Sequence, residues 1–286
     1  MTIKAYLLNV FGVDESGGNP AGVVLHADEL TDEQKKKIAK EIGFSETAFI
    51  QKSTKADFKI TFFTPNAEVD LCGHATIATW TVLLKKGMIN PGEYTQELKA
   101  EILNVNILKD ESIIMDQTPP VFKKEIDSDV IATLLNIPSS WITNKPQVVS
   151  TGLNDLIIPI DTREHLFAIK LDDKRIAEFE KQHELDSFHI FTFDTLKKES
   201  IAHSRNCDPL HAISEESATG SATGALACYL YKNGKLPYLH DLSFEQGYSM
   251  KNPSEINVSL EANEGEITRV QVGGKANIIG EKEMKV

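Results

Sequence analysis

Two segments of this sequence begin with glycine and a polar side chain, a pattern suited to binding an anion. Gly73 and His74 precede Ala-Thr in one segment, and Gly220 and Ser221 precede Ala-Thr in the other. The first N–H groups of a helix have no partner within the helix and carry the positive end of its dipole. Glycine lets a ligand approach that backbone closely. The sequence therefore predicts two helix N-termini able to hold a carboxylate, with further donors from His74 and Ser221.

The two segments form an internal repeat. Each runs from Gly to Gly over 15 residues, 73–87 and 220–234, and seven of the 15 aligned positions are identical. Average composition would give about one or two matches by chance. A repeat near half the chain length predicts two halves of one fold, each built on one such helix. The alternatives are a coincidental pair of Ala-rich helices, and Gly and Ser residues that only cap core helices.

Length and charge agree with an ordinary two-domain protein. The chain has 286 residues, 41% of them hydrophobic and 25% charged, which suits two domains of about 140 residues. Its net charge of −12 argues against a non-specific nucleic-acid binder, because such proteins need clustered Lys and Arg. A small anionic ligand remains compatible, since a helix N-terminus can bind one locally.

The three cysteines, Cys72, Cys207 and Cys228, are odd in number and lack metal-ligand spacing. Together with a start that has no long apolar region, they predict a reduced, cytoplasmic chain without a metal. No apolar run approaches the roughly 18 residues of a membrane span. Neither a dinucleotide-binding glycine fingerprint nor a P-loop follows a strand, so we expect no nucleotide cofactor.

Local patterns predict mixed helices and strands. Thr31 and Gln34 form a capping box for a helix that stops at Gly43. Other helices are expected near 128–136 and 172–183, besides the two glycine-opened ones. Strands are expected near 3–11, 21–26, 44–51, 57–64, 102–108, 112–116, 147–150, 156–160, 166–170, 188–193 and 199–204, and after the second glycine-opened helix.

Short strands around one long Ala-rich helix, twice over, favour an α+β fold. We expect two pseudo-symmetric domains, each a mixed sheet curled around a central helix that is apolar on nearly all sides. The predicted domains are 1–118 and 119–286, with a tail near 276–286 that can pack back on the first. Pro119-Pro120, followed by the charged Lys123-Lys124-Glu125, is the predicted linker.

Four motifs resemble, in the same order, those of the PhzF family of phenazine-biosynthesis-like isomerases. They are Asn19-Pro20-Ala21-Gly22, Ser45-Glu46-Thr47, Asp70-Leu71-Cys72-Gly73-His74 and Glu215-Glu216-Ser217-Ala218-Thr219-Gly220-Ser221. The resemblance implies the diaminopimelate epimerase fold, in which each domain is a sheet curled into a barrel around a central helix and the site lies between the domains. It also implies a cofactor-independent enzyme and a homodimer.

The resemblance assigns roles to matching residues. Glu46 is the implied acid/base that moves a proton on the substrate, His74 assists it or fixes the substrate, and Ser221 donates a hydrogen bond. Because Glu46 precedes an apolar strand, we expect burial to keep its pKa near neutrality, as a group that accepts and returns a proton requires.

Two positions depart from the related enzymes. Glu216 stands where the phenazine enzyme has aspartate, which keeps the charge on a longer arm. Diaminopimelate epimerase has a catalytic cysteine before each helix-opening glycine, whereas this chain has Cys72 and Thr219 there. Threonine cannot supply a second thiol, so two-cysteine racemisation is not expected. Cys72 is then either a ligand contact or a small buried apolar residue.

The expected function is a cofactor-independent isomerase that moves a proton on a small carboxylate substrate. The catalytic candidates are Glu46, His74 and Glu216. The substrate-binding candidates are Asp70, Cys72, Gly73, Gly220 and Ser221. A racemase, epimerase or dehydratase on the same fold, and a non-catalytic binding protein, are the alternatives. The sequence does not name the substrate.

Overall fold

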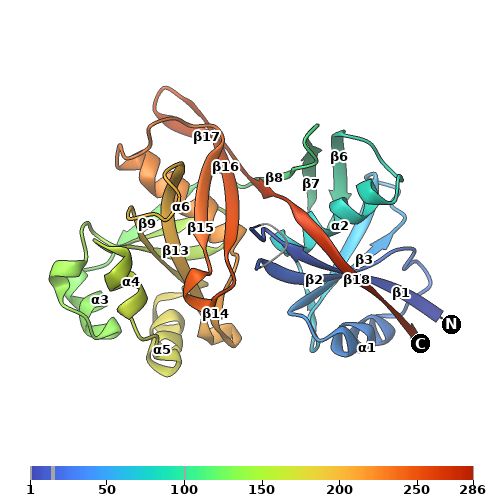
Figure 1. The fold of residues 1–286 in the computed structure, drawn as a ribbon, viewed down its shortest axis with the longest axis horizontal. Coiled ribbons are helices and arrows are strands. Elements are labelled where there is room, and N and C mark those ends of the chain that lie inside the picture. Colours follow the sequence, from blue (N-terminus) through green and yellow to red (C-terminus); the bar gives the residue numbers. More distant parts are fainter. Residues whose placement is uncertain (1, 14–16, 100, 286) are drawn as a thin grey trace. The chain divides into compact units, whose positions relative to one another are not determined.

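Two compact units make up the computed structural model, which describes residues 2–13, 17–99 and 101–285 (Figure 1). Unit 1 comprises Met1–Asp116 and Gly273–Val286, and unit 2 comprises Gln117–Val272. The chain therefore leaves unit 1 once and returns to it at the C-terminus. Within the described residues, no helix is both long and apolar enough to cross a membrane.

Unit 1 is a mixed sheet with two helices. Its strands are β1 (Thr2–Val10), β2 (Asn19–Val24), β3 (Glu46–Gln51), β4 (Phe58–Phe63), β5 (Glu68–Val69), β6 (Gly92–Glu97), β7 (Ile102–Ile107), β8 (Ile113–Gln117) and β18 (Ala276–Lys285). Its helices are α1 (Asp32–Ile42) and α2 (Gly73–Lys85). Antiparallel pairs join β18 to β1, β1 to β2, β3 to β4, β4 to β5, β6 to β7 and β7 to β8, whereas β2–β3 and β4–β6 are parallel.

Unit 2 has the same kinds of element. Its strands are β9 (Val121–Glu125), β10 (Gln147–Ser150), β11 (Asn154–Pro159), β12 (Ser187–Thr192), β13 (Ser200–Asp208), β14 (Ile213–Glu216), β15 (Leu242–Gln246) and β16 (Ser254–Asn263), and β17 (Glu266–Gly274) begins in it. Its α-helices are α3 (Ser128–Leu135), α4 (Arg163–Ala168), α5 (Asp173–His183) and α6 (Gly220–Lys232). The 3₁₀ turns are η1 (Ser139–Trp141), η2 (Pro209–His211) and η3 (Tyr248–Met250).

The strand pairings of unit 2 repeat those of unit 1. β9 pairs antiparallel with β10 as β18 does with β1, and β11–β12 and β13–β15 are parallel, as β2–β3 and β4–β6 are. The antiparallel pairs β10–β11, β12–β13, β13–β14 and β15–β16 complete the correspondence. The internal repeat of the sequence thus corresponds to a duplicated architecture, and the predicted α+β class is confirmed.

Each unit buries one helix of the repeat. α2 is buried from His74 to Leu83 and contacts β1, β2, β3 and β18. α6 is buried from Ala222 to Leu230 and contacts β10, β11, β12 and β16. A helix covered by its own sheet on several sides must be apolar around its circumference, which explains its composition.

The identical residues of the repeat have structural roles in these helices. The hydroxyls of Thr76 and Thr223 donate to the carbonyl oxygens of Cys72 and Thr219, each at 2.8 Å. These bonds tie down a polar side chain inside the core. After each helix, a glycine adopts the left-handed conformation at which a helix ends, with φ of 68° at Gly87 and 63° at Gly234.

The local predictions missed the short strands β5 and β14 and differ from the structure at three further places. The segment near 166–170 is helical rather than a strand, because the Thr162 side chain caps the first turn of α4 by accepting from the backbone of His165. The predicted linker residues Lys123-Lys124-Glu125 belong to β9, a largely exposed strand that pairs with β10. Strand β6 was not predicted, since its polar sequence lacks an apolar alternation.

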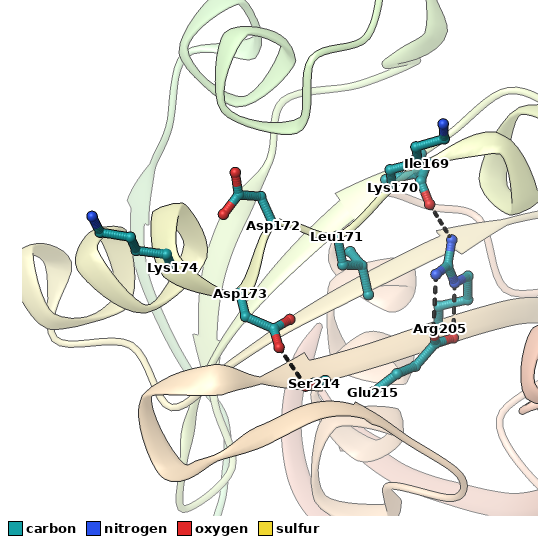
Figure 2. Close-up of a pocket in the computed structure, with 9 residues that line it drawn as sticks. All are labelled: Ile169, Lys170, Leu171, Asp172, Asp173, Lys174, Arg205, Ser214 and Glu215. Carbon is teal, nitrogen blue, oxygen red and sulfur yellow. Dashed lines mark hydrogen bonds and ion pairs between the residues drawn. The ribbon is translucent and has the colours of Figure 1, made fainter.

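The hairpin of β13 and β14 leads directly into the loop before α6. Arg205 on β13 holds Glu215 on β14 through two hydrogen bonds of 2.8 Å, and its Nη1 donates to the carbonyl oxygen of Ile169 (Figure 2). The same Nη1 donates to the carbonyl oxygen of Leu166. Such bidentate pairing fixes both partners in orientation. Glu216, the next residue, is therefore presented from an anchored strand.

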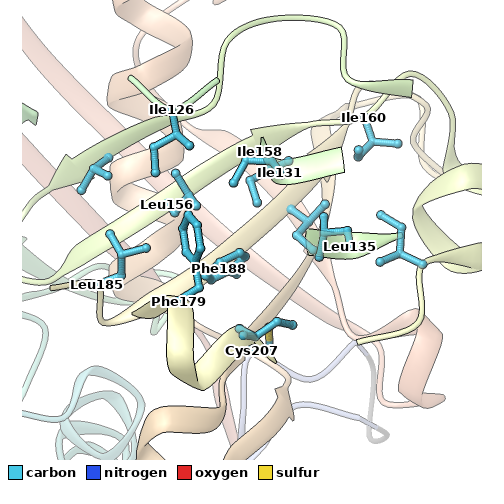
Figure 3. Close-up of a cluster of buried hydrophobic side chains, with 14 of the residues drawn as sticks. Ile126, Ile131, Leu135, Leu156, Ile158, Ile160, Phe179, Leu185, Phe188 and Cys207 are labelled. Carbon is cyan, nitrogen blue, oxygen red and sulfur yellow. The ribbon is translucent and has the colours of Figure 1, made fainter. Parts of the chain in front are cut away.

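Unit 2 has an apolar core beside its sheet. Figure 3 shows residues from α3, α5 and the sheet packed together, including Ile131, Leu135, Phe179 and Phe188. Burial of this apolar area is the main stabilising term in such a layer. One face of the sheet of unit 2 therefore packs against an apolar core.

Candidate active site

Three of the predicted site residues lie together in unit 1. Nε2 of His74 lies 3.1 Å from Oε2 of Glu46. Sγ of Cys72 lies 3.5 Å from Nδ1 and 3.9 Å from Nε2 of the same ring. The His74 and Glu46 side chains are only 8% and 17% exposed. The fold therefore assembles a carboxylate, an imidazole and a thiol in one mostly buried place.

Residues far apart in the sequence position these groups. Helix α1 begins with the predicted capping box of Thr31 and Gln34 and ends at Gly43, which has φ 79°. This end returns the chain to β3, whose first residue is Glu46. β3 runs parallel to β2, with Glu46 beside Ala21 in the register. Cys72 and His74 come from the N-terminus of α2.

The ion pair opposes the effect of burial on the two titrating groups. Burial alone would raise the pKa of Glu46, but His74, with smaller contributions from Ser45 and Cys72, holds that pKa below its ordinary value. The expectation of a near-neutral Glu46 was therefore wrong, because it ignored the histidine beside it. Burial alone would lower the pKa of His74, but its hydrogen bond with Cys72, together with the hydrogen bond and the charge of Glu46, holds that pKa well above the ordinary value.

Cys72 carries its proton at neutral pH. Burial raises the pKa of its thiol, with a smaller opposing contribution from His74. Since a neutral thiol has no charge, Glu46 is the anion that faces the imidazolium under these conditions. The thiol is a contact of both partners of the ion pair rather than an isolated packing residue.

The three donor atoms lie within 4.8 Å of one another, a grouping that could hold a metal ion. Nitrogen, sulfur and carboxylate ligands are those that Zn²⁺ takes in proteins. A bound cation would have to displace the protons that His74 and Cys72 hold at neutral pH, because metal ligands must be deprotonated. The spacing of the cysteines in the sequence did not reveal this grouping, since Glu46 lies 26 residues before Cys72.

One oxygen of Glu46 is buried against the imidazole of His74. Oε2 has almost no access to solvent, and Nε2 of His74 lies 3.1 Å from it. Taking a carboxylate out of water costs free energy, and a positively charged partner at this distance offsets part of that cost. The ion pair therefore keeps a buried carboxylate in its ionised, proton-accepting form.

Asn19 also belongs to this group, and the sequence analysis did not assign it a role. Its Nδ2 lies 3.3 Å from Nδ1 of His74, on the opposite edge of the ring from the atom that faces Glu46. Asn19 is the first residue of the Asn-Pro-Ala-Gly motif and is 4% exposed. The motif was a signal for this residue, but a contact across 55 residues of sequence was not predictable from spacing.

The predicted residues of unit 2 gather at the N-terminus of α6. The hydroxyl of Thr219 donates to Oε2 of Glu216 at 2.8 Å. Oε1 of Gln246 accepts from the backbone N–H of Thr219, and its Nε2 donates to the carbonyl oxygen of Glu216. The carbonyl oxygen of Ser221 accepts from the hydroxyl of Thr151. Glu216 is thus held beside the helix start by Thr219.

The two central helices lack the side-chain caps that the other α-helices have. Of the described α-helices, α1, α3, α4 and α5 each have a capping side chain, from Thr31, Asp127, Thr162 and Asp172. The residues at the cap positions of α2 and α6, Cys72 and Thr219, make no capping hydrogen bond. The alternative in which these segments open with ordinary capped turns is therefore not supported, and their first N–H groups are suited to a ligand.

Gly73 leaves space beside the N-terminus of α2. A Cβ at this position would come no closer than 3.8 Å to another atom, the sulfur of Met115. The predicted site residue Asp70 has an exposed carboxylate, which forms an ion pair with Lys99 at 3.0 Å.

A pocket elsewhere in unit 2 is less suited to catalysis. It is lined by Ile169–Lys174, Arg205, Ser214 and Glu215 (Figure 2). The guanidinium of Arg205 is occupied by Glu215 and two carbonyl oxygens, and Ser214 bonds to Asp173. Arg205, Glu215, Ser214 and Asp173 are therefore engaged in bonds within the unit.

Known proteins resemble this chain over nearly its whole length. The family described as phenazine biosynthesis-like protein matches residues 8–282. An uncharacterized isomerase, YfhB of Bacillus subtilis, is 33% identical over 91% of this chain and 90% of its own length. An uncharacterized isomerase of Clostridium acetobutylicum is 30% identical, covering 98% of this chain and 97% of its own.

Solved structures support the same assignment. A phenazine biosynthesis protein of the PhzF family from Bacillus anthracis has a TM-score of 0.91 and 26% identity, with all of both chains covered. A hydroxyproline epimerase from Agrobacterium vitis has a TM-score of 0.61 over 99% of this chain and 92% of its own, and at 12% identity it shows a shared fold alone. The chain therefore belongs to the phenazine biosynthesis-like family (PhzC-PhzF) and is an isomerase of that type.

Proposed function

We propose that this isomerase moves a proton on a small carboxylate-bearing metabolite without a cofactor, with Glu46 as the acid/base. The observation that carries the proposal is the buried ion pair of Glu46 and His74, in which Oε2 lies 3.1 Å from Nε2. The charged histidine keeps Glu46 ionised and ready to accept a proton. After the transfer, His74 can donate to the newly neutral acid or to charge that develops on the substrate.

The uncapped helix starts suggest how the substrate is held. The N–H groups at Gly73 and at Gly220 attract a carboxylate, and the hydroxyl of Ser221 is an added donor. We propose that Glu216 and Ser221 contribute polar contacts to a carboxylate bound at the start of α6. Thr219 restrains Glu216 by its hydrogen bond, which suits a positioned acid or a polar contact.

The test is proton exchange with solvent. Small carboxylic acids are screened by thermal shift, and those that bind are incubated with the enzyme in D₂O and followed by NMR. We expect a shifted double bond with unaltered stereocentres for the true substrate. Glu46→Gln should abolish turnover while ligand affinity changes by less than about tenfold, roughly 1.4 kcal/mol, because the amide keeps the shape but cannot carry the proton.

Glu180→Gln is the matched control, since burial raises the pKa of Glu180 to about 8 and the side chain is neutral near pH 7. An amide in its place should leave turnover unchanged. Unchanged kcat in Glu46→Gln would reject Glu46 as the proton carrier.

A racemase or epimerase is the second candidate, favoured by the Cys72 thiol beside the ion pair. Such an enzyme needs acid and base on opposite faces of one carbon. Thr219 stands at the place equivalent to Cys72. Its side chain is a hydroxyl rather than a thiol, and that hydroxyl donates a hydrogen bond to Glu216. Inversion with complete deuterium incorporation at that carbon would favour this candidate over the single-carboxylate isomerase.

A further inference from the structure

The Asn-Pro-Ala-Gly motif contributes a side chain to the group around Glu46. Strand β2 begins at Asn19, which pairs with Val10 of β1 in the register. Three residues on, Gly22 allows β2 to lie close to β3, because a Cβ there would come within 2.9 Å of the Thr47 hydroxyl and 3.0 Å of Ile42. The motif therefore fixes the backbone of Asn19 next to the strand that carries Glu46.

We propose that Asn19 is a positioning residue, which holds the ring of His74 so that Nε2 faces Glu46 and carries a proton there. This inference rests on the proposed function of Glu46 and His74. The two ring nitrogens have different partners: Nδ1 lies 3.3 Å from Nδ2 of Asn19 and 3.5 Å from Sγ of Cys72, and Nε2 lies 3.1 Å from Glu46. In catalytic triads in general, a third residue orients the catalytic base in the same way, by contacting the ring nitrogen that faces away from the reacting partner.

An amide is suited to this place for a chemical reason. In the neutral ring, the N–H of Asn19 donates to Nδ1, which leaves the ring proton on Nε2. In the charged ring, Nδ1 carries a proton, and the amide can turn to accept it with Oδ1. An isomerase that takes and returns a proton needs both states of the ring. Aspartate could accept from the charged ring but could not donate to the neutral one.

The substitutions that test this residue have a matched control in unit 2. Asn206 lies with its Nδ2 3.1 Å from Nδ1 of His189, so it forms a second buried Asn–His pair outside the site. Asn19→Leu keeps the approximate shape and removes the hydrogen bond, and Asn19→Asp keeps an acceptor and adds charge. Asn206→Leu removes the equivalent contact from His189 and should not affect His74.

The measurement is ¹⁵N NMR of histidine-labelled protein across a pH series, with the His74 signals assigned through His74→Gln. In the wild type we expect the neutral ring to carry its proton on Nε2. Asn19→Leu should give a mixture of the two tautomers, and Asn19→Asp should raise the pH at which the ring loses its charge. Circular dichroism melts would identify any variant that has not folded, and Asn19→Asp then carries the test.

Turnover gives the second readout. Asn19→Leu should lower kcat by about tenfold or more with KM little changed, because the ring is misplaced while the substrate contacts remain. An unchanged tautomer and an unchanged titration in both Asn19 variants would overturn the proposal. The NMR measurement needs no substrate, so it tests the role of Asn19 even if no turnover is found. Absence of turnover by the wild type would reject the proposed function instead.

Discussion

Ser187 holds in unit 2 the place that Glu46 holds in unit 1. Each is the first residue of a strand paired in parallel with its neighbour: Glu46 lies beside Ala21 in the β2–β3 register, and Ser187 lies beside Asp155 in the β11–β12 register. The duplicated frame has therefore kept its pairing while its chemistry diverged. Unit 1 has a carboxylate at this position and unit 2 has a hydroxyl, which fits a reaction that uses a single carboxylate.

His74 should set the acid limit of activity. Activity requires ionised Glu46, so it falls as the pH drops through the pKa of that group, which His74 holds below its ordinary value. In His74→Gln, the imidazolium no longer opposes the effect of burial on Glu46, so the pKa of Glu46 should rise. We expect the acid limb of the pH–kcat/KM profile to move to higher pH, with a loss of kcat/KM of about 100-fold.

His189→Gln is the control for that substitution, because burial lowers the pKa of His189 to about 3 and the ring is neutral at the working pH. Its acid limb should coincide with that of the wild type. An acid limb that stays in place in His74→Gln would show that the imidazolium does not govern the ionisation of Glu46.

Cys72 should be dispensable for the proposed reaction. Cys72→Ala removes one buried sulfur, at a cost of roughly 1 kcal/mol of folding stability, and leaves the Glu46–His74 pair in place. We expect kcat within about tenfold of the wild type, measured in the D₂O assay. Cys207→Ala, which removes a buried thiol from the core of unit 2, controls for the loss of packing. Complete loss of activity confined to Cys72→Ala would revive a thiol mechanism.

The start of α6 should bind an anion. Because Thr219 does not cap this helix, its first N–H groups are suited to a carboxylate, and Ser221 adds a hydroxyl. Ser221→Ala combined with Gly220→Ala should weaken carboxylate binding by about tenfold or more, measured by isothermal titration with a substrate or inhibitor. Ser214→Ala, at a serine that bonds to Asp173 elsewhere in unit 2, should bind normally. Equal affinity in both variants would contradict the anion site.

The sequence predicted those parts of the fold that depend on short-range signals. The capping box of Thr31 and Gln34 and the Gly-to-Gly repeat located α1, α2 and α6 because capping and helix termination involve neighbours in the chain. The prediction for α4 was wrong because six residues with one buried apolar position, Leu166, do not show a helical period.

The candidate site was only partly predictable. Motif positions identified Glu46, His74 and Cys72, but the low pKa of Glu46 depends on an imidazolium 28 residues later in the chain. The contact of Asn19 with His74 depends on the packing of β2 against α2. Such pairings arise from tertiary structure, and spacing along a single sequence does not encode them in a readable way.

Unit 2 contains a buried carboxyl that the proposed reaction does not use. Asp155 is 1% exposed, and its Oδ1 accepts a hydrogen bond of 2.6 Å from Ser187. Its Oδ2 is buried and has no hydrogen-bond partner among the described residues. Burial raises the pKa of Asp155 to about 8, and nearby Asp186 and Asp208 add to the shift against the effect of Ser187. The folded protein therefore holds a proton here that the unfolded chain releases near pH 4.

This proton should make unit 2 lose stability as the pH rises. A group whose pKa is higher in the folded state contributes most below its unfolded pKa, and the contribution of Asp155 should fall by about 1.4 kcal/mol per pH unit between roughly pH 4 and pH 8. Asp155→Asn removes this dependence, so the variant should gain stability relative to the wild type as the pH increases. Hydrogen exchange of the β12 amides, corrected for the intrinsic pH effect, measures it locally. Asp129→Asn, at an exposed aspartate on α3, is the control. A stability difference between Asp155→Asn and the wild type that stays constant from pH 5 to pH 8 would show that Asp155 is ionised in the folded protein throughout that range.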